Sequence, residues 1–142
     1  MAKIAVVFWS GSGNTEAMAN AVVEGAEQGG VEVELIRVGD FSADRIADYD
    51  GLLMGCPACG TEELDDGEFE PFFAEALPGL KGKKVAIFGS YGWGDGEWLR
   101  TWADRCRSGG VTLMDDGLAV NETPDDAAVA NCTAWGEKLA AF

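Results

Sequence analysis

Short apolar runs alternate with amphipathic, helix-like segments along the whole of this 142-residue chain, and this alternation limits the possible folds more than any other feature. The runs have the length of strands, and most of them are continuously apolar. Such strands are typical of a parallel sheet whose two faces are both covered by helices. The expected strands are residues 3–8, 31–38, 51–55 and 85–89, with a fifth divided into 112–114 and 118–120.

Four helices are expected between and after these strands, at residues 14–28, 69–77, 96–108 and 124–141. The last is predicted to begin with Thr123 as N-cap and Pro124 at the first helical position. Apolar stripes should face the sheet, and they comprise Ala17, Met18, Ala21, Val22 and Gly25, then Trp98, Leu99, Trp102 and Cys106, and finally Val129, Cys132, Trp135 and Leu139. Because no repeat or linker interrupts the pattern, residues 1–142 are predicted to form one domain.

The chain contains no histidine. This absence excludes histidine as a general acid or base, Ser-His-Asp and Cys-His nucleophiles, and most zinc sites. Cys106 and Cys132 fall within apolar helix stripes and have no metal-ligand spacing. No metal site is therefore predicted.

Acidic residues outnumber basic ones by 25 to 10, which gives a formal net charge of −15. Nucleic acids and anionic membranes are bound mainly through basic patches, so neither is an expected partner. The charge is compatible with a simple solubility role or with attraction of basic partners. No segment approaches the ~20 apolar residues of a membrane span, and the N-terminus does not resemble a secretory signal. We expect a cytoplasmic protein.

Residues 9–15, Trp-Ser-Gly-Ser-Gly-Asn-Thr, join the first strand to the first helix. Backbone N–H groups at a helix N-terminus attract an anion, and Gly11 and Gly13 let the backbone curl around it. No Lys or Arg occurs from position 9 to position 36, so this is not a Walker loop, which needs a lysine. The loop is expected to hold a single phosphate by hydrogen bonds, or else to be a turn without a ligand. Its side-chain donors would be Ser10, Ser12, Asn14 and Thr15.

Two further unusual loops follow the third and fourth strands. They comprise residues 56–63, Cys-Pro-Ala-Cys-Gly-Thr-Glu-Glu, and residues 89–96, Gly-Ser-Tyr-Gly-Trp-Gly-Asp-Gly. Ligands of parallel sheets bind beyond the carboxyl ends of the strands, where these loops should meet the first one. Trp93, between glycines, would either stack on a flat aromatic ligand or cover the sheet edge.

Together the three loops resemble, in composition, order and spacing, the FMN-binding loops of short-chain flavodoxins, and the similarity extends over essentially the whole chain. The resemblance implies an α/β fold, a flavodoxin-like three-layer sandwich with a five-stranded parallel sheet in the order 2-1-3-4-5 and helices on both faces. It implies non-covalently bound FMN and a low-potential one-electron carrier, not an enzyme, working mainly between semiquinone and hydroquinone. It also implies a monomer that forms transient complexes with redox enzymes bearing basic docking surfaces.

By analogy with the family, residues 10–15 would hold the phosphate and Trp93 would stack on the outer face of the isoalloxazine, with Tyr91 and Gly92 along its edge. No residue is expected to be catalytic. The cofactor-binding residues predicted in this way are Ser10, Gly11, Ser12, Gly13, Asn14, Thr15, Pro57, Ala58, Cys59, Gly60, Thr61, Glu62, Ser90, Tyr91, Gly92, Trp93, Gly94, Asp95 and Gly96.

The resemblance also implies a movement in the second loop. When the flavin N5 gains a proton on reduction, the peptide between Gly60 and Thr61 would flip so that its carbonyl accepts the new N–H. Gly60 suits this because glycine tolerates positive φ. Glu62 would accept a hydrogen bond from the flavin N3–H.

Residues 62–68, Glu-Glu-Leu-Asp-Asp-Gly-Glu, place carboxylates near the predicted flavin, and no cation is predicted in the three loops. Since fully reduced flavin is expected to be anionic, these charges should oppose the last electron. One carboxylate roughly 10 Å away costs about 1.7 kcal/mol at an effective dielectric constant of about 20, or roughly 70 mV for one electron. Several screened charges would lower the second potential by on the order of 100 mV. The same run could also be a solvated helix start.

Cys59 occupies a position where the family often places methionine, and it completes a C-x2-C motif with Cys56. The motif leaves open a dithiol redox protein using Cys56 and Cys59, or a thiol switch beside the flavin. Against dithiol catalysis, the acidic run that follows should raise the thiol pKa values. Cys56, at a strand end, is expected to be buried.

Two other classes share this fold. An FMN-dependent reductase, such as a quinone reductase, typically carries an insertion near the last strand, for which this chain has no room. A ligand-free signalling receiver would need acidic residues where the first strand ends, and this chain has Phe-Trp-Ser at positions 8–10. The electron carrier is therefore the favoured function.

Overall fold

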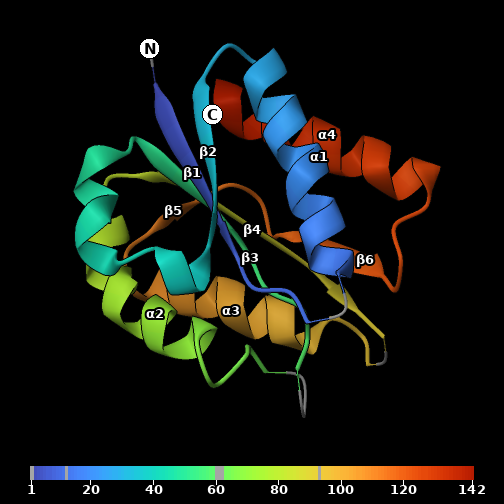
Figure 1. The fold of residues 1–142 in the computed structure, drawn as a ribbon. Helices are drawn as coiled ribbons and strands as arrows, with labels where there is room; N and C mark the ends of the chain where they lie inside the picture. The colour runs from blue at the N-terminus through green and yellow to red at the C-terminus, as the bar shows by residue number, and fades with distance from the viewer. Residues whose placement is uncertain (1, 12, 60–62, 93) are drawn as a thin grey trace.

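The computed structural model describes residues 2–11, 13–59, 63–92 and 94–142, and within these ranges it is a three-layer sandwich (Figure 1). A parallel sheet forms the middle layer, in the order β2-β1-β3-β4-β5. This order confirms the predicted flavodoxin-like topology. The first strands of the chain are β1 (Lys3–Phe8), β2 (Glu32–Arg37), β3 (Gly51–Gly55) and β4 (Lys84–Tyr91).

The last position in the sheet is divided, as predicted, into β5 (Thr112–Leu113) and β6 (Leu118–Asn121). Both pieces pair in parallel with β4, with Lys84 opposite Thr112 and Phe88 opposite Leu118. The connecting turn contains Gly117 at φ 104°. Glycine adopts this left-handed conformation without steric penalty.

Helices cover both faces of the sheet (Figure 1). On one face lie α1 (Asn14–Gln28) and α4 (Asp126–Ala141), and on the other lie α2 (Phe69–Ala76) and α3 (Glu97–Ser108). Short 3-10 segments at Val38–Asp40, Ala43–Asp48 and Leu77–Leu80 complete the connections. α1 and α4 touch through Gly25 and Gly136, where an added Cβ would lie 1.8 Å and 2.1 Å from a carbonyl oxygen of the other helix.

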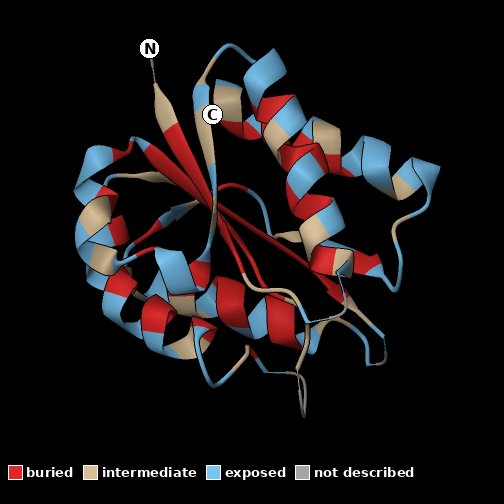
Figure 2. Cartoon of the chain, viewed as in Figure 1, coloured by how far each residue is buried: buried red, intermediate tan, exposed pale blue. Residues whose placement is uncertain are grey.

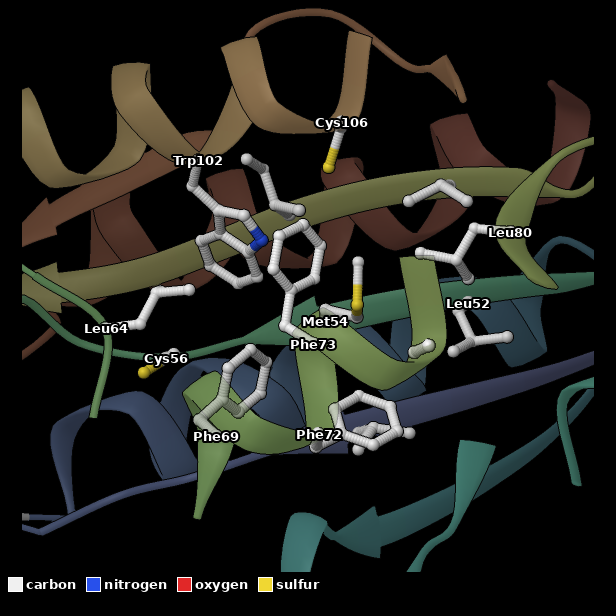
Figure 3. Close-up of a cluster of buried hydrophobic side chains, with 14 of the residues drawn as sticks. Leu52, Met54, Cys56, Leu64, Phe69, Phe72, Phe73, Leu80, Trp102 and Cys106 are labelled. Carbon is white, nitrogen blue, oxygen red and sulfur yellow. The ribbon is translucent and has the colours of Figure 1, made fainter. Parts of the chain in front are cut away.

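The sheet separates two apolar cores, seen as the buried inner surfaces in Figure 2. In the core under α2 and α3, Trp102 meets Phe69 and Phe73 edge to face, with ring centroids 5.3 Å and 6.1 Å apart (Figure 3). The core under α1 and α4 includes Met18, Val22 and Leu139. Burial on both faces, which continuous apolar strands predict, is found in β1, β3 and β4 but not in the edge strand β2, which has no buried residue.

Two expected stripe positions are wrong. Ala17 is exposed, as is Val129 at 40% of its full surface, whereas Thr15 and Ala19 are buried. α1 and α4 approach each other closely at Gly25 and Gly136. This close approach, rather than the position of the most apolar side chains, determines which face of each helix is buried. The stripe of α3 is buried as predicted.

The predicted start of the last helix is also wrong. Asp125, not Thr123, is the N-cap, and its Oδ1 accepts the N–H of Ala128 at 2.8 Å. A carboxylate is the stronger acceptor at this position. Thr123 instead donates its hydroxyl to Asn14 Oδ1 at 3.2 Å. Among the helices in the described parts of the chain, none is both long and apolar enough to cross a bilayer.

Candidate functional site

The loops that follow β1, β3 and β4 surround a cavity of about 370 Å³ at the carboxyl edge of the sheet. This volume lies within the range of small-molecule sites. Each of the three predicted loops supplies part of the wall, and one further residue comes from the turn after β6. The lining residues are Trp9, Gly11, Asn14, Pro57, Ala58, Cys59, Ser90, Tyr91, Gly92 and Glu122.

Backbone hydrogen bonds continue the sheet pairing into these loops. The Trp9 N–H donates to Gly55 O at 2.9 Å, and the Ala58 N–H donates to Ser90 O at 3.0 Å. On the far side, the Glu122 N–H donates to Tyr91 O at 2.7 Å. The cavity wall is therefore held by the sheet itself.

The first loop is organised by Gly13 and Ser10. Gly13 is the N-cap of α1 and has φ 94°, which favours glycine. Ser10 Oγ accepts the N–H groups of Gly13 at 3.1 Å and Glu16 at 3.3 Å. Because these bonds use only its acceptor capacity, the Ser10 hydroxyl retains a proton to donate.

A cation from outside the predicted loop lies beside it. Arg37, the last residue of β2, forms an ion pair with Glu16 in the first turn of α1, at 2.9 Å. Both side chains are largely exposed. Since the guanidinium is paired, the local charge around the first turn is close to balanced.

A buried hydroxyl pair joins the first loop to the third. Thr15 is fully buried, and its Oγ1 lies 2.9 Å from Ser90 Oγ. The N–H of Ser90 also donates to Thr15 Oγ1 at 3.4 Å. Thr15 thus fixes the relative position of two loops that are 75 residues apart in the chain.

The second loop is fixed at both ends. Trp98 of α3 donates its indole N–H to Cys56 O at 3.0 Å, and Cys59 and Glu63 exchange backbone hydrogen bonds of 2.8 and 2.9 Å. The two thiols turn toward one acceptor. Cys56 Sγ and Cys59 Sγ lie 3.5 Å and 3.6 Å from Pro57 O.

The thiols differ in environment. Cys56 is fully buried, as predicted, and burial raises its pKa, with a hydrogen bond to Cys59 as a further cause. The pKa of the Cys59 thiol is lowered, first of all by the hydrogen bond from Cys56, although burial and the carboxylates of Asp65 and Asp66 act in the opposite direction. The predicted rise is therefore wrong for Cys59, because a direct hydrogen bond outweighs screened carboxylates.

Part of the acidic run has a structural role. Asp65 Oδ2 accepts the N–H groups of Glu68 at 2.7 Å and Phe69 at 2.9 Å, and so caps the start of α2. Glu70, in the first turn of that helix, forms a two-pronged ion pair with Arg105 at 2.6 and 2.8 Å. Glu70 and Arg105 border a second cavity, of about 320 Å³, that lies between α3 and the segment 63–70 and is also lined by Thr101 and Trp102.

The predicted site residues fall into four groups. Those on the cavity wall are Gly11, Asn14, Pro57, Ala58, Cys59, Ser90, Tyr91 and Gly92. Ser10, Gly13 and Thr15 hold the first loop in shape behind that wall. Ser12, Gly60, Thr61, Glu62 and Trp93 lie outside the described residues, and with them the proposed peptide flip and stacking contact.

The structure does not place the remaining predicted residues on the wall of this cavity. Gly94, Asp95 and Gly96 lead into α3, and Gly96 is its N-cap at φ 90°. The Asp95 carbonyl and carboxylate accept hydrogen bonds from Arg100 at 2.9 and 3.1 Å. The third loop therefore divides into a half that lines the cavity and a half that starts the helix.

Trp9 and Glu122 line the cavity and are absent from the predicted set. Trp9 directly follows β1, so its place at the strand end was a usable signal. Glu122 directly follows β6, and it comes to the cavity because β6 pairs with β4. Its φ of 55° is unusual for a non-glycine residue.

Comparisons with known proteins point to one family. The family model for flavodoxin matches residues 6–136. The chain is 47% identical over 137 residues to a flavodoxin from Megasphaera elsdenii, covering 96% of this chain and 98% of that one. It is 43% identical over 135 residues to a flavodoxin from Clostridium beijerinckii, covering 95% and 97%.

The solution structure of two-electron reduced Megasphaera elsdenii flavodoxin superposes with a TM-score of 0.88 at 46% identity, covering 98% of this chain and 99% of that one. The family transfers electrons to redox partners by means of bound FMN. This chain therefore belongs to the flavodoxin family and is an FMN-binding electron carrier rather than an enzyme.

Proposed function

We propose that FMN occupies the cavity at the carboxyl edge of the sheet, with its phosphate on the first loop and its ring between the second and third loops. The observation that carries this placement is that three segments distant in sequence, predicted separately as ligand loops, line one cavity of about 370 Å³. The site residues proposed are those predicted above.

The first loop has the features that a phosphate monoester needs. Gly13 caps α1 without a side chain, so the backbone at the helix N-terminus is accessible to an anion. The Ser10 hydroxyl can donate, as described. Because Arg37 is paired with Glu16, the anchor relies on hydrogen bonds and the helix dipole rather than on a free cation.

The walls of the cavity beyond the phosphate end suit a flat aromatic group. Trp9 and Tyr91 contribute aromatic surface, and Pro57 and Ala58 contribute small apolar surface. These side chains would orient the ring and exclude water from it. FMN, when bound, supplies the one-electron redox chemistry.

The carboxylates around the second loop oppose the addition of negative charge. Glu63 and Asp66 are exposed near the loop, while Asp65 faces the start of α2. A negatively charged surrounding makes the last electron harder to add, so we propose a low second potential. The same charges favour partners that dock through basic surfaces.

We further propose that residues 1–142 form a single domain that works as a monomer in the cytoplasm. The net charge of −15 supports the monomer, since like-charged copies repel each other, and the single sheet that the described residues form supports one domain.

The placement is tested by filling the cavity. Ala58→Trp puts a large ring into the wall between the second and third loops, and Ala127→Trp adds the same ring at the start of α4, away from this cavity. Binding is followed by quenching of FMN fluorescence. Ala58→Trp should weaken FMN binding by more than about 100-fold, roughly 2.7 kcal/mol, and Ala127→Trp should bind like the parent chain. Equal binding by both variants would place FMN elsewhere.

A further inference from the structure

Cys56 and Cys59 connect the apolar core to the cavity. Cys56 is fully buried and belongs to the core cluster under α2 and α3 (Figure 3). Cys59 is half-buried and lines the cavity together with Ala58 and Tyr91. A reagent in the cavity can therefore reach Cys59 but not Cys56.

The sulfur atoms of Cys56 and Cys59 lie beside the same backbone oxygen. Both lie within 3.6 Å of the same acceptor, Pro57 O. Two residues separate the cysteines, and such a spacing allows the Cα atoms to approach within the range that a disulfide needs. The hydrogen bond from Cys56 lowers the pKa of the Cys59 thiol, which raises its thiolate fraction.

We propose that Cys56 and Cys59 form a reversible thiol–disulfide pair, oxidised by low-molecular-weight disulfides, that weakens FMN binding when it closes. This inference rests on the proposed placement of FMN in the same cavity. Cys59 is the reactive thiol and Cys56 the resolving thiol.

The chemistry balances in two exchanges. The Cys59 thiolate attacks one sulfur of the small disulfide, so that a mixed disulfide forms and one thiolate leaves. Cys56 then attacks the Cys59 sulfur, and the second thiol is released with the proton of Cys56. The net change is one protein dithiol and one small disulfide converted to one protein disulfide and two small thiols.

Closing the bond changes the cavity wall. Bonded sulfurs lie about 2.05 Å apart, so neither sulfur can keep its contact with Pro57 O unchanged. Cys56 Sγ also accepts the N–H of Asp65 at 3.4 Å, a bond that this movement disturbs. Backbone hydrogen bonds hold Cys59 to Glu63 and Ala58 to Ser90. The movement of the two sulfur atoms therefore has to be accommodated within the wall that would face FMN.

Thermodynamic linkage makes the effect reciprocal. If the disulfide lowers FMN affinity by some factor, saturating FMN must shift the dithiol–disulfide equilibrium toward the dithiol by the same factor. Bound FMN should also cover Cys59 and slow its first exchange. The FMN affinity of the oxidised form and the dithiol–disulfide equilibrium in the presence of FMN thus report the same coupling free energy.

The experiment treats the full chain with glutathione disulfide, with and without saturating FMN, and identifies the products by mass and peptide mapping. FMN affinity of the dithiol and oxidised forms is measured by fluorescence quenching. We expect a Cys56–Cys59 disulfide, slower formation with FMN, and FMN binding weakened roughly tenfold, inside the ~5–150-fold range of coupled sites.

Single substitutions separate the two thiols. Cys56→Ala should stop at a mixed disulfide on Cys59, and Cys59→Ser should leave Cys56 unmodified because that sulfur is buried. Each variant is compared with the parent by circular dichroism. A mixed disulfide on Cys56 in the Cys59→Ser protein would overturn the assigned order.

Two results overturn the proposal while leaving the FMN site intact. In one, all four thiols stay free after oxidant although the protein binds FMN. In the other, the disulfide forms but FMN affinity changes by less than about twofold, below the coupling expected. Failure of the dithiol form to bind FMN at all, or insensitivity to Ala58→Trp, would instead overturn the FMN placement and this inference with it.

Discussion

The Thr15–Ser90 hydroxyl pair gives the sharpest prediction about how the site is held together. Both side chains are buried, with exposed fractions of 0% and 4%, and their oxygens lie 2.9 Å apart. Thr15→Val keeps the shape of the side chain but removes the oxygen. Ser90 then keeps a buried hydroxyl without this partner, and its N–H loses a 3.4 Å acceptor.

An unsatisfied buried polar group costs about 1–3 kcal/mol, so Thr15→Val should lower the free energy of unfolding by about 2 kcal/mol, a roughly 30-fold change in the unfolding equilibrium. Ser90→Ala should cost a similar amount, because the Thr15 hydroxyl is then left buried. The double substitution removes both hydroxyls together. Its cost should therefore be no larger than that of either single substitution, at most about 2 kcal/mol, rather than the additive sum of about 4.

The assay is urea unfolding followed by circular dichroism at several FMN concentrations. Ligand binding adds to stability by mass action, so extrapolation to zero FMN separates the hydrogen-bond effect from any change in affinity. The reasoning is refuted if Thr15→Val costs less than about 0.5 kcal/mol, or if the single costs add to within that margin.

Three other perturbations test separate parts of the structure. Gly136→Ala should lower the free energy of unfolding by about 1–3 kcal/mol, since the added Cβ would lie 2.1 Å from a backbone oxygen of α1, whereas Gly67→Ala, with its nearest neighbour at 3.8 Å, should be nearly neutral in the same urea assay. Asp66→Asn should raise the second one-electron potential by on the order of 10–50 mV at low salt and by less at high salt; a salt-independent or absent change in a spectroelectrochemical titration would contradict it. Iodoacetamide should alkylate Cys59 at lower pH than Cys132, because a hydrogen bond lowers the pKa of the first thiol while burial raises that of the second to about 11; the reverse order in peptide maps would be inconsistent with these environments.

The sheet order and the position of the cavity could be predicted because they depend on local signals. Fully apolar runs predict strands buried on both faces, and parallel strands bring their carboxyl-end loops to one edge. The residues of β3, for example, are all buried, as their composition indicates. The meeting of Gly11, Ala58 and Gly92 at one cavity follows from that topology.

The contacts that sequence reasoning missed depend on residues brought together by the fold. Thr15 is predicted as a phosphate donor, and its hydrogen bond with Ser90, 75 residues away, was not foreseen. The acidic run predicts a raised pKa for the Cys59 thiol, yet the hydrogen bond from Cys56 has the larger effect and lowers it. In both cases one short-range hydrogen bond, set by tertiary structure, outweighs the local composition.

Helix faces and ends were missed for a related reason. Val129 belongs to the apolar side of α4, but the helix rotates so that Gly136 can approach α1, and Val129 is left exposed. Asp125 and Thr123 are both acceptable N-caps by residue type; Asp125 caps α4, and Thr123 is bonded to Asn14 of another helix. Neither the buried face nor the N-cap of α4 can be predicted from the sequence of that helix alone.

The most direct test of the FMN placement is an amide NMR titration of the full chain with FMN. We predict that the largest chemical-shift changes, in slow exchange, occur at the backbone amides of Gly11, Gly13, Asn14, Ala58, Cys59, Tyr91 and Gly92. The changes at Glu70, Thr101 and Arg105, which border the second cavity, should be small. Largest shifts at those three residues, or none at the loop amides under saturating FMN, would contradict the account.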